Sequence, residues 1–307
     1  MAHVHQLVLQ HGRAKARDLV STKHERLCVD VAAEILAAES DELGITHSGF
    51  CLTALPHKEI LDTIWRRENH KLTLIVEAGL DKSGNPIGVP YGPKARMILL
   101  YLQTKAIQTN CREIELGNSM RDWMFRMNIS DGGKTYKQVR EQAYRISACR
   151  LTFFWEDEHD DLRMNGAFVK TAINLKSATA DIRQQHLWKD TVELDESFFE
   201  ALKAHPVPLW EPALRQISGK SLAIDIYIWL AYRLRSLKKP LTLSWPSIHR
   251  QFGAGYKEVW HLKPQFTDAL KLALAVYPEA VVDVTRKAVT LHPSPPPVSD
   301  NRLISMR

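Results

Sequence analysis

Several side chains in this sequence are of types that bind nucleotides, but their spacing does not complete a nucleotide-binding motif. Gly133, Lys134 and Thr135 resemble the end of a phosphate-binding loop. The position five residues before Gly133 is Asn128, and the segment ahead of it is predicted to be a helix rather than a buried strand. The backbone cradle for a phosphate is therefore missing, and we expect no nucleotide cofactor.

Carboxylates and histidines also occur close together without forming a recognisable catalytic or metal site. Five acidic residues gather between two predicted strands, where a solvated hairpin turn is a better interpretation than a two-carboxylate or metal site. They are Glu156, Asp157, Glu158, Asp160 and Asp161. The pairs His3 with His5 and His57 with His70 lack an H-E-x-x-H motif or companion cysteines. No G-x-S-x-G nucleophile motif is present. The sequence therefore predicts no catalytic residue, metal or other cofactor, and a protein that is not an enzyme.

Basic side chains offer a different chemistry, the binding of phosphate groups. The 307 residues contain 41 Lys and Arg against 35 Asp and Glu, a formal charge of +6. The excess is uneven, because residues 1–89 carry −2 whereas residues 90–185 and 186–307 carry +4 each. Residues 90–150 alone hold 11 basic and 5 acidic side chains. This distribution favours an anionic partner for the later segments, and nucleic acid is the usual one.

Composition also limits where the protein works. No run of 18 apolar residues occurs, and the first residues lack the apolar segment of a secretory signal, so we expect neither a membrane span nor secretion. Cys28, Cys51, Cys111 and Cys149 lie 23, 60 and 38 residues apart and form no C-x-x-C pair. A cytoplasmic location with reduced cysteines is therefore expected.

Two predicted helices present basic or amide side chains opposite an apolar stripe. In the segment Lys134 to Cys149 the apolar stripe consists of Tyr136, Val139, Ala143 and Ile146. Lys134, Lys137, Gln138, Glu141 and Arg145 lie on the opposite side. Long basic and amide side chains on an outward face are what a helix needs to contact phosphates and base edges. An ordinary solvated face is the alternative.

The second such helix is predicted from Pro264 to Val276. Its buried stripe is Phe266, Ala269, Leu270, Ala273 and Leu274, with Gln265 and Lys271 outward or sideways. Pro264 either opens this helix or kinks a longer one, and we favour the opening. Trp260 just before it is interpreted as a core anchor, because base stacking needs unpaired bases. Further basic or polar candidates close to this helix are Arg250, Lys257, His261 and Lys263.

The order of the predicted elements occurs twice along the chain. A long helix, a short strand, a short helix, a glycine-containing turn, a second helix and a hairpin run from residue 95 to 173, and again from residue 222 to 292. The helix-to-strand spacing is 18 residues in the first copy and about 19 in the second. Such a layout is that of a winged helix, so we predict an α+β fold with tandem winged-helix domains, each with a helix-turn-helix and a β-hairpin wing.

This fold sets the expected domain boundaries. Residues 1–49 form an N-terminal helical extension, residues 50–185 the first winged-helix domain with preceding strands, and residues 186–293 the second; residues 294–307 form a proline-rich tail, extended or disordered. The helix from Ala95 to Ile107 is apolar nearly all round. Such a helix is either buried centrally or shared with a partner, and a dimer built on it or its neighbouring sheet is one of our hypotheses.

The sequence resembles a known family in both the order and the spacing of its segments. These segments are CLTALPHK from residue 51, the long run from GVPYGPKARMILLYL at residue 88 to MRDWMFRMNI, QVREQAYRISACRLTF, TVELDESFFEALKAHPVPLW from 191, LAIDIYIWLAYRL from 222, LSWPSIHRQFG and HPSPPPV. They are similar to the RepA-type plasmid replication initiators of Gram-negative bacteria. The similarity spans roughly residues 50–298, and residues 1–49 show none.

The resemblance implies a protein that binds repeated origin sequences (iterons) in double-stranded plasmid DNA. It also implies help in opening the origin, recruitment of the host replication initiator and replicative helicase, and dimers that repress their own promoter. The second winged helix makes most base contacts in related initiators, whereas the first contacts phosphates or dimerises. For this chain that implies base or nearby contacts by Lys257, His261, Lys263, Gln265 and Lys271, and backbone contacts by Lys134, Lys137 and Arg145.

Two other classes stay open at this stage. A winged-helix transcriptional regulator has no role in replication, and its gene need not lie beside an array of short direct repeats. A DNA-nicking enzyme needs a catalytic tyrosine and a histidine metal cluster. Genetic context separates the first from an initiator, and a nicking assay on supercoiled origin DNA with Mg²⁺ or Mn²⁺ separates the second.

Overall fold

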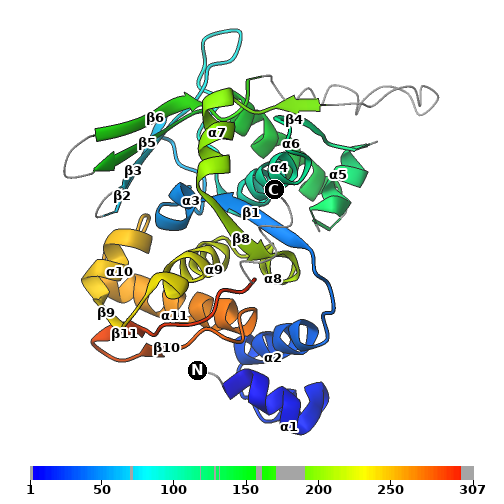
Figure 1. Ribbon diagram of the computed structural model, residues 1–307, viewed down its shortest axis with the longest axis vertical. Helices are drawn as coiled ribbons and strands as arrows, with labels where there is room; N and C mark the ends of the chain where they lie inside the picture. Colours follow the sequence, from blue (N-terminus) through cyan, green and yellow to red (C-terminus); the bar gives the residue numbers. More distant parts are fainter. Residues whose placement is uncertain are drawn as a thin grey trace. The chain divides into compact units, whose positions relative to one another are not determined.

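The chain folds into two units (Figure 1). The computed structural model describes residues 3–69, 72–117, 119–127, 129–130, 132–156, 161–170 and 191–298. The terminal unit contains residues 1–44, 50–52 and 207–307, and the central unit residues 45–49 and 53–206. The chain passes between them within β1 (Leu43–His47) and α3 (Ser48–Leu52), and again at β8 (Pro206–Trp210). Strands β1 and β8 pair with each other.

The central unit combines helices with a four-stranded antiparallel sheet. Its sheet has the order β2-β3-β5-β6, and a second, two-stranded sheet joins β4 to β7. The strands are β2 (Ile64–Asn69), β3 (Leu72–Glu77), β4 (Glu113–Glu115), β5 (Arg150–Glu156), β6 (Asp161–Ala167) and β7 (Thr191–Glu193). The helices are α4 (Gly92–Thr109), α5 (Met120–Arg126), α6 (Gly133–Ala148) and α7 (Glu196–Ala204).

Helix α4 is the core of the central unit. Residues on every side of it are buried, including Ile98 and Leu102 with no exposed surface, and α6, α7 and β4 pack around it. Its buried polar side chains are paired: Thr104 Oγ1 accepts from Ile45 N at 2.8 Å, and the Gln103 amide oxygen accepts from His47 N at 2.7 Å. The apolar surface of α4 is covered within its own unit. Of the two alternatives, α4 is therefore buried centrally, and a dimer built on the neighbouring sheet stays a prediction.

The terminal unit is mainly helical and holds a three-stranded antiparallel sheet of order β10-β11-β9. The strands are β9 (Leu241–Ser244), β10 (Val282–Val284) and β11 (Ala288–Leu291). The helices are α1 (His3–Asp18), α2 (Lys23–Leu36), α8 (Glu211–Ile217), α9 (Ser221–Arg233), the 3₁₀ helix η2 (Leu234–Ser236), α10 (Trp245–Phe252) and α11 (Val259–Ala275). The packed rings of Trp229, Phe252, Phe266 and Trp245 fill the space between α9, α10 and α11.

The N-terminal helices belong to the terminal unit rather than forming a separate extension. A capping box at Thr22 and Glu25 begins α2, whose buried side chains include Val29 and Ile35. This apolar stripe packs on α11 and α8, and His5 Nε2 lies 2.9 Å from the Ala275 carbonyl oxygen. The segment expected to be a separate extension therefore shares a unit with residues from 207 onward. The boundary at residue 186 also moves, because β7 and α7 pack in the central unit.

The two copies predicted from the sequence occur in the expected order, but their strands pair differently. In the terminal unit the hairpin β10–β11 pairs with β9, the strand that follows the long helix. In the central unit the hairpin β5–β6 pairs with β3, and the corresponding strand β4 pairs with β7 instead. Strand β3 buries Leu72, Leu74 and Val76 and pairs with β5, the first strand of its hairpin, whereas β9 pairs with β11, the second strand of the other hairpin. The molecule is a mixed α and β fold.

The predicted start of the last helix is wrong. Helix α11 begins at Val259, and Pro264 lies inside it. Proline removes one helical hydrogen bond, here to the carbonyl of Trp260. That residue is 65% exposed, so water can solvate the freed carbonyl, while Leu262 and Phe266 on either side of the proline are fully buried and hold the helix on the core. Burial on both sides outweighs the missing bond.

The segments at the ends of the predicted domains have different outcomes. The end of the first predicted domain, residues 171–185, and most of the acidic hairpin turn lie outside the described residues. The proline-rich segment is ordered as far as Val298, which is 3% exposed, and the Tyr277 hydroxyl donates to the Pro295 carbonyl at 2.5 Å. Residues 294–298 therefore pack on the terminal unit instead of forming a free tail.

Candidate nucleic-acid interface

The candidate interface in the terminal unit is built on the first half of α11, the turn before it and the β10–β11 hairpin. Ser244 caps α10 by accepting from Ser247 N, and Gly255 at φ 90° allows the turn to reverse. His249 Nε2 lies 2.9 Å from the Tyr256 carbonyl oxygen and closes this turn on α10. Helix α11 thus starts from a fixed position.

Lys263 joins α11 to the tip of the hairpin. Its ammonium donates to the Arg286 carbonyl at 2.7 Å and lies 4.8 Å from the centre of the Trp245 ring. The attraction between the ammonium and the indole face strengthens the attachment that the hydrogen bond provides. Trp245 itself is buried. Lys263 therefore holds the hairpin against the helix, so that the hairpin tip and the start of α11 form one continuous surface.

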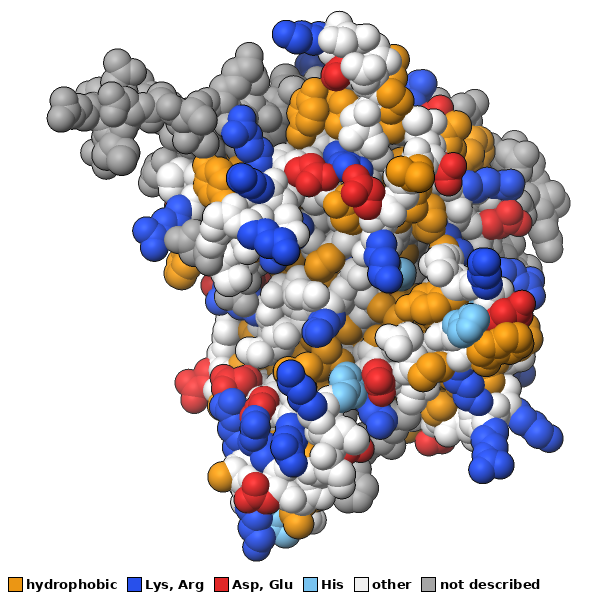
Figure 2. Space-filling view, turned by 180° about the vertical axis from the view of Figure 1, so that it is seen from behind, with side chains coloured by type: hydrophobic (Ala, Val, Ile, Leu, Met, Phe, Trp, Pro, Cys, Tyr) orange, Lys and Arg blue, Asp and Glu red, His pale blue; other side chains and the backbone are white. Residues whose placement is uncertain are grey.

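Four of the predicted residues in this unit are exposed. Arg250 lies on α10, Lys257 in the turn, and His261 and Gln265 on α11. At the hairpin tip Arg286 and Lys287 are exposed as well. Figure 2 shows Lys and Arg side chains projecting at the edge that carries this hairpin. The charge needed to hold phosphates therefore surrounds α11.

Lys271 does not join this group. Its ammonium lies 3.9 Å from the Glu25 carboxylate of α2, and its side chain is 38% exposed. In the same place His24 Nε2 lies 2.8 Å from the Asp268 carbonyl oxygen. Helix α2 thus covers the second half of α11, which the sequence pattern could not show because α2 is more than 200 residues away.

In the central unit the exposed face of α6 carries three of the four predicted residues. Lys134, Lys137 and Gln138 are exposed, and Arg140 and Tyr144 lie on the same face. The predicted apolar stripe is confirmed for Val139, Ala143 and Ile146, which are fully buried. This helix has the separation of faces that a surface-binding helix needs.

Arg145 is the exception, and its predicted outward position is wrong. The residue is 8% exposed and donates to the Val89 carbonyl at 3.1 Å. Its guanidinium also pairs with Glu59 and with Glu141, and it lies 5.0 Å from the centre of the Tyr91 ring. The loop before α4 covers this side of α6, so Arg145 holds its own unit together and is not available to a phosphate.

Three further residues were missed or misread from the sequence. Arg286 and Lys287 belong to a segment interpreted only as a hairpin turn, yet two adjacent basic residues at a wing tip are a signal for phosphate contact. Trp260, interpreted as a core anchor, is 65% exposed. Its ring meets the His261 ring edge-on at 5.5 Å. The exposed side of α11 therefore carries a large apolar group.

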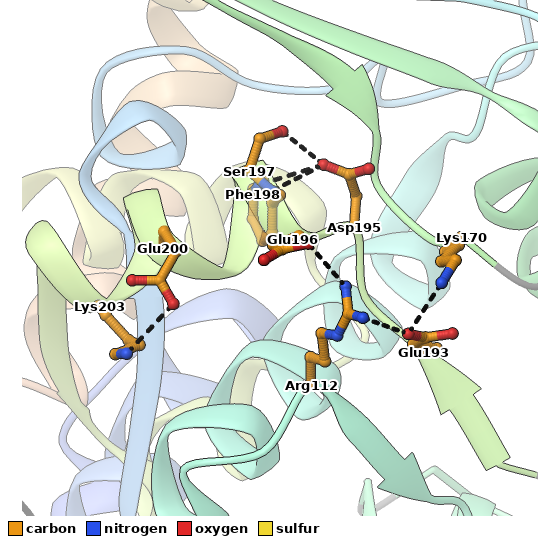
Figure 3. Close-up of polar contacts among 9 residues, drawn as sticks. All are labelled: Arg112, Lys170, Glu193, Asp195, Glu196, Ser197, Phe198, Glu200 and Lys203. Atoms are coloured by element: carbon orange, nitrogen blue, oxygen red, sulfur yellow. Dashed lines mark hydrogen bonds and ion pairs between the residues drawn. The ribbon is translucent and has the colours of Figure 1, made fainter.

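A cluster of charged residues where β7 meets α7 has a structural role (Figure 3). Arg112 lies between the carboxylates of Glu193, at 2.9 Å, and Glu196, at 3.5 Å, and Lys170 also pairs with Glu193. Asp195 accepts from the backbone N–H groups of Ser197 and Phe198 and so begins α7. These contacts satisfy the charges within the central unit and explain why β4 pairs with β7.

Two of the histidines and two of the cysteines noted in the sequence are engaged or buried within the fold. His5 and His57 each contact a group of the chain itself, the Ala275 carbonyl and the Arg96 guanidinium. Burial raises the pKa of the Cys28 thiol to about 11 and that of Cys149 to about 12, which disfavours reactive thiolates. Within the described ranges no group of three His, Cys, Asp or Glu could hold a metal ion. No described helix has the length and apolar character to span a membrane.

Comparison with known proteins identifies the family. The model of the plasmid-encoded RepA proteins matches residues 89–246, just over half of the chain. The chain therefore belongs to this family, and the resemblance to RepA-type plasmid replication initiators is confirmed. No curated protein matches the sequence.

One solved structure supports the fold. A crystal structure of selenomethionine-substituted domains 2 and 3 of RctB covers 78% of this chain and 94% of its own, with a TM-score of 0.51 and 12% sequence identity. A second crystal structure of RctB domains 2 and 3 gives a TM-score of 0.49 with 13% identity, covering 84% of this chain and 99% of its own. At this identity the first likeness is evidence for a shared mixed helix-and-strand fold.

Proposed function

We propose that this protein is a plasmid replication initiator that binds repeated sequences in double-stranded origin DNA. The two copies act as tandem winged-helix domains. In the terminal unit α11 enters the major groove and the β10–β11 hairpin serves as the wing on the flanking backbone. In the central unit α6 contacts phosphates through Lys134, Lys137 and Gln138. Membership of the plasmid-encoded RepA family supports the assignment to replication.

One observation carries the proposal: an exposed helix face is bordered by basic side chains on both sides. The first half of α11 presents His261 and Gln265, while Lys257 precedes it and the wing tip adds Arg286 and Lys287. Phosphate contacts of this kind position a protein on the duplex, and side chains on the helix then read base edges. The contact between Lys263 and the Arg286 carbonyl fixes the distance between helix and wing.

The proposal extends to the partners of an initiator. Binding to adjacent repeats lets the protein open the origin and recruit the host initiator and replicative helicase. A dimer of the same chain represses its own promoter at an inverted repeat, whereas a monomer with two tandem domains suits a direct repeat. Because α4 is covered within its unit, the dimer contact lies elsewhere on the molecule.

Footprinting of the purified protein on the DNA upstream of its own gene tests the binding step. We expect protection of an array of short direct repeats. The double variant Arg286→Ala with Lys287→Ala should bind the repeats more weakly, and the slope of log K against log salt should fall by about 0.9 for each phosphate that the variant no longer neutralises. Lys82→Ala removes an exposed lysine from a turn in the central unit and serves as the matched control, with an unchanged slope.

Replication of a plasmid that carries the gene and its upstream repeats tests the biological role. We expect replication that depends on both the gene and the repeats. Specific binding without replication would assign the protein to transcriptional regulation instead. Nicking of supercoiled origin DNA in the presence of Mg²⁺ or Mn²⁺ would assign it to DNA processing, and unprotected upstream DNA would overturn the proposal.

A further inference from the structure

The exposed face of α11 has an unusual composition for a helix that contacts DNA. Trp260, Pro264 and Asp268 follow one another at intervals of four residues, and His261 and Gln265 lie beside them on the same face. All five are exposed, Trp260 by 65%. Neither lysine nor arginine lies among them. The face therefore offers one indole, one imidazole, one pyrrolidine ring, one amide and one carboxylate.

Each of the two lysines of α11 is engaged by another part of the terminal unit. Lys263 donates to the Arg286 carbonyl of the wing and lies over the Trp245 ring. Lys271 faces the Glu25 carboxylate of α2. Lys263 therefore lies beside the wing, and Lys271 lies beyond Asp268, where α2 meets the helix.

The N-terminal helices limit how much of α11 can enter a groove. Leu272 and Ala275, in the second half of α11, are 2% and 0% exposed. Helix α2 packs on α11, and His24 reaches the Asp268 carbonyl. Only the first half of the helix, from Trp260 to Asp268, is left open to a base pair.

Base edges in the major groove select for particular side-chain chemistry. Arg and Lys pair with the two acceptors of guanine, Gln pairs with N6 and N7 of adenine, Asp accepts from N4 of cytosine, and apolar groups contact the thymine methyl. We propose that α11 reads an A·T-rich sequence, with Gln265 on adenine, Trp260 and Pro264 on thymine methyl groups and Asp268 on a cytosine amino group. The proposal rests on the proposed function, because it assigns the bases read by the same helix.

The charges around the helix fit this assignment. A carboxylate close to DNA is repelled by the phosphates unless it accepts a hydrogen bond from a base. Asp268 lies on the same face as Gln265, one turn further along the helix, and therefore faces the groove rather than the backbone when α11 is inserted. Lys257 in the turn and the wing tip supply the positive charge on either side. The edge-on contact of His261 with Trp260 orients the indole.

Selection of bound duplexes from a random library by the full-length protein is the first test. We expect an enriched motif rich in A·T pairs with one cytosine contact. Each thymine of the motif is then replaced by deoxyuridine, which removes only the C5 methyl group. We expect about fourfold weaker binding at one or two positions, the effect of withdrawing one buried methyl group.

Substitutions in α11 connect each base to a side chain. At the thymine that Trp260 contacts, Trp260→Ala should bind the thymine and deoxyuridine duplexes equally, whereas Trp260→Phe should keep the difference there. Gln265→Arg should change the preferred base at one position from adenine to guanine, with a discrimination of roughly 5- to 150-fold. Arg286→Ala serves as the control, because it should weaken binding to all duplexes by the same factor.

The outcomes separate the base assignment from the proposed function. A motif dominated by guanine contacts, or equal binding of thymine and deoxyuridine at every position, would overturn the base assignment while leaving the DNA-binding function in place. If the Gln265→Arg variant still preferred the wild-type motif, the assignment of Gln265 to adenine would be overturned, again without affecting the DNA-binding function. A library without any enriched motif would overturn both proposals.

Discussion

The guanidinium of Arg145 connects three parts of the central unit. It binds the Val89 carbonyl from the loop before α4, pairs with Glu59 from the segment before β2, and pairs with Glu141 at 2.8 Å on its own helix. Its burial against the Tyr91 ring replaces the hydration it would have on an open helix face. Arg145 is a structural residue at the edge of the candidate surface.

We therefore expect Arg145→Ala to lower the free energy of unfolding without changing the salt dependence of DNA binding. Removal of hydrogen bonds to a charged group should cost about 2 to 3 kcal/mol. Lys137→Ala, on the exposed face of the same helix, should leave stability unchanged and lower the salt slope. Urea unfolding and binding titrations on both variants check this. If Arg145→Ala left the free energy of unfolding unchanged but reduced the slope of log K against log salt, Arg145 would be a DNA contact and not a structural residue.

His47 gives the central unit a dependence on pH. The residue is 1% exposed, and burial, followed by the nearby His205, lowers its pKa from 6.5 to about 4. Its Nδ1 accepts from Gly49 N at 3.1 Å, which requires that nitrogen to be unprotonated. The folded state therefore holds the neutral ring.

Because the pKa of His47 is lower in the folded than in the unfolded chain, its contribution to stability is complete above pH 6.5. It is lost as the pH falls from 6.5 to 4, with a total of about 3 kcal/mol. We expect His47→Asn, which keeps an acceptor for Gly49 N, to lose less stability between pH 7.5 and pH 5 than the wild-type chain. Urea unfolding at several pH values measures the difference, and the exposed His11→Asn is the control. If the free energy of unfolding changed with pH in the same way for His47→Asn and the wild type, this account would be contradicted.

At the scale of elements, the start of α7 is fixed by one carboxylate. Asp195 accepts from Ser197 N at 3.0 Å and from Phe198 N at 3.4 Å, which satisfies two of the unpaired N–H groups of the first turn. Phe198 behind it is buried and contacts Phe168 edge-on. The cap thus aligns an apolar helix face with the core.

Asp195→Ala should lower the free energy of unfolding by about 1 kcal/mol, within the range of about 0.5 to 2 kcal/mol found when a helix cap is removed. Glu200→Gln breaks an exposed ion pair with Lys203 on the same helix. This variant should change the free energy of unfolding by less than about 0.5 kcal/mol. Thermal unfolding of both variants gives the comparison. Equal effects would mean that the cap contributes no more than a surface ion pair.

Whole-molecule organisation depends on helices that are distant in sequence. Helix α2 packs on α11 and α8, so the beginning and the end of the chain share one core. Its buried side chains are Cys28, Val29, Val31, Ala32 and Ile35. Residues 3–36 are therefore part of the unit that carries the proposed DNA-reading helix.

Ile35→Ala should destabilise the terminal unit by about 2 to 5 kcal/mol, because Ile35 is 4% exposed and its truncation leaves a cavity. Leu36→Ala is the matched control, since Leu36 is the adjacent residue and is 39% exposed. Its effect should be within about 1 kcal/mol. Circular dichroism during urea unfolding measures both. An Ile35→Ala variant as stable as Leu36→Ala would show that α2 contributes little to the core.

The sequence by itself determined the local elements. Periodic apolar residues predicted α6 to within a residue at each end, and the repeated order of elements predicted a hairpin in each copy. It also determined the family, because the order and spacing of the quoted segments can be recognised in a single sequence. These features depend on interactions between residues close in sequence, which a periodic pattern records directly.

Only the tertiary structure decided which faces are free. Arg145 lies on the outward side of its helix by periodicity, yet a loop covers it. Helix α2 covers Lys271, β4 pairs with β7 instead of with the hairpin of its own copy, and burial on both sides of Pro264 keeps a helix continuous through a proline. Each outcome depends on contacts between segments far apart in the chain. A periodic pattern gives the direction of a side chain from its own helix axis, and the neighbour that it meets there is set by packing.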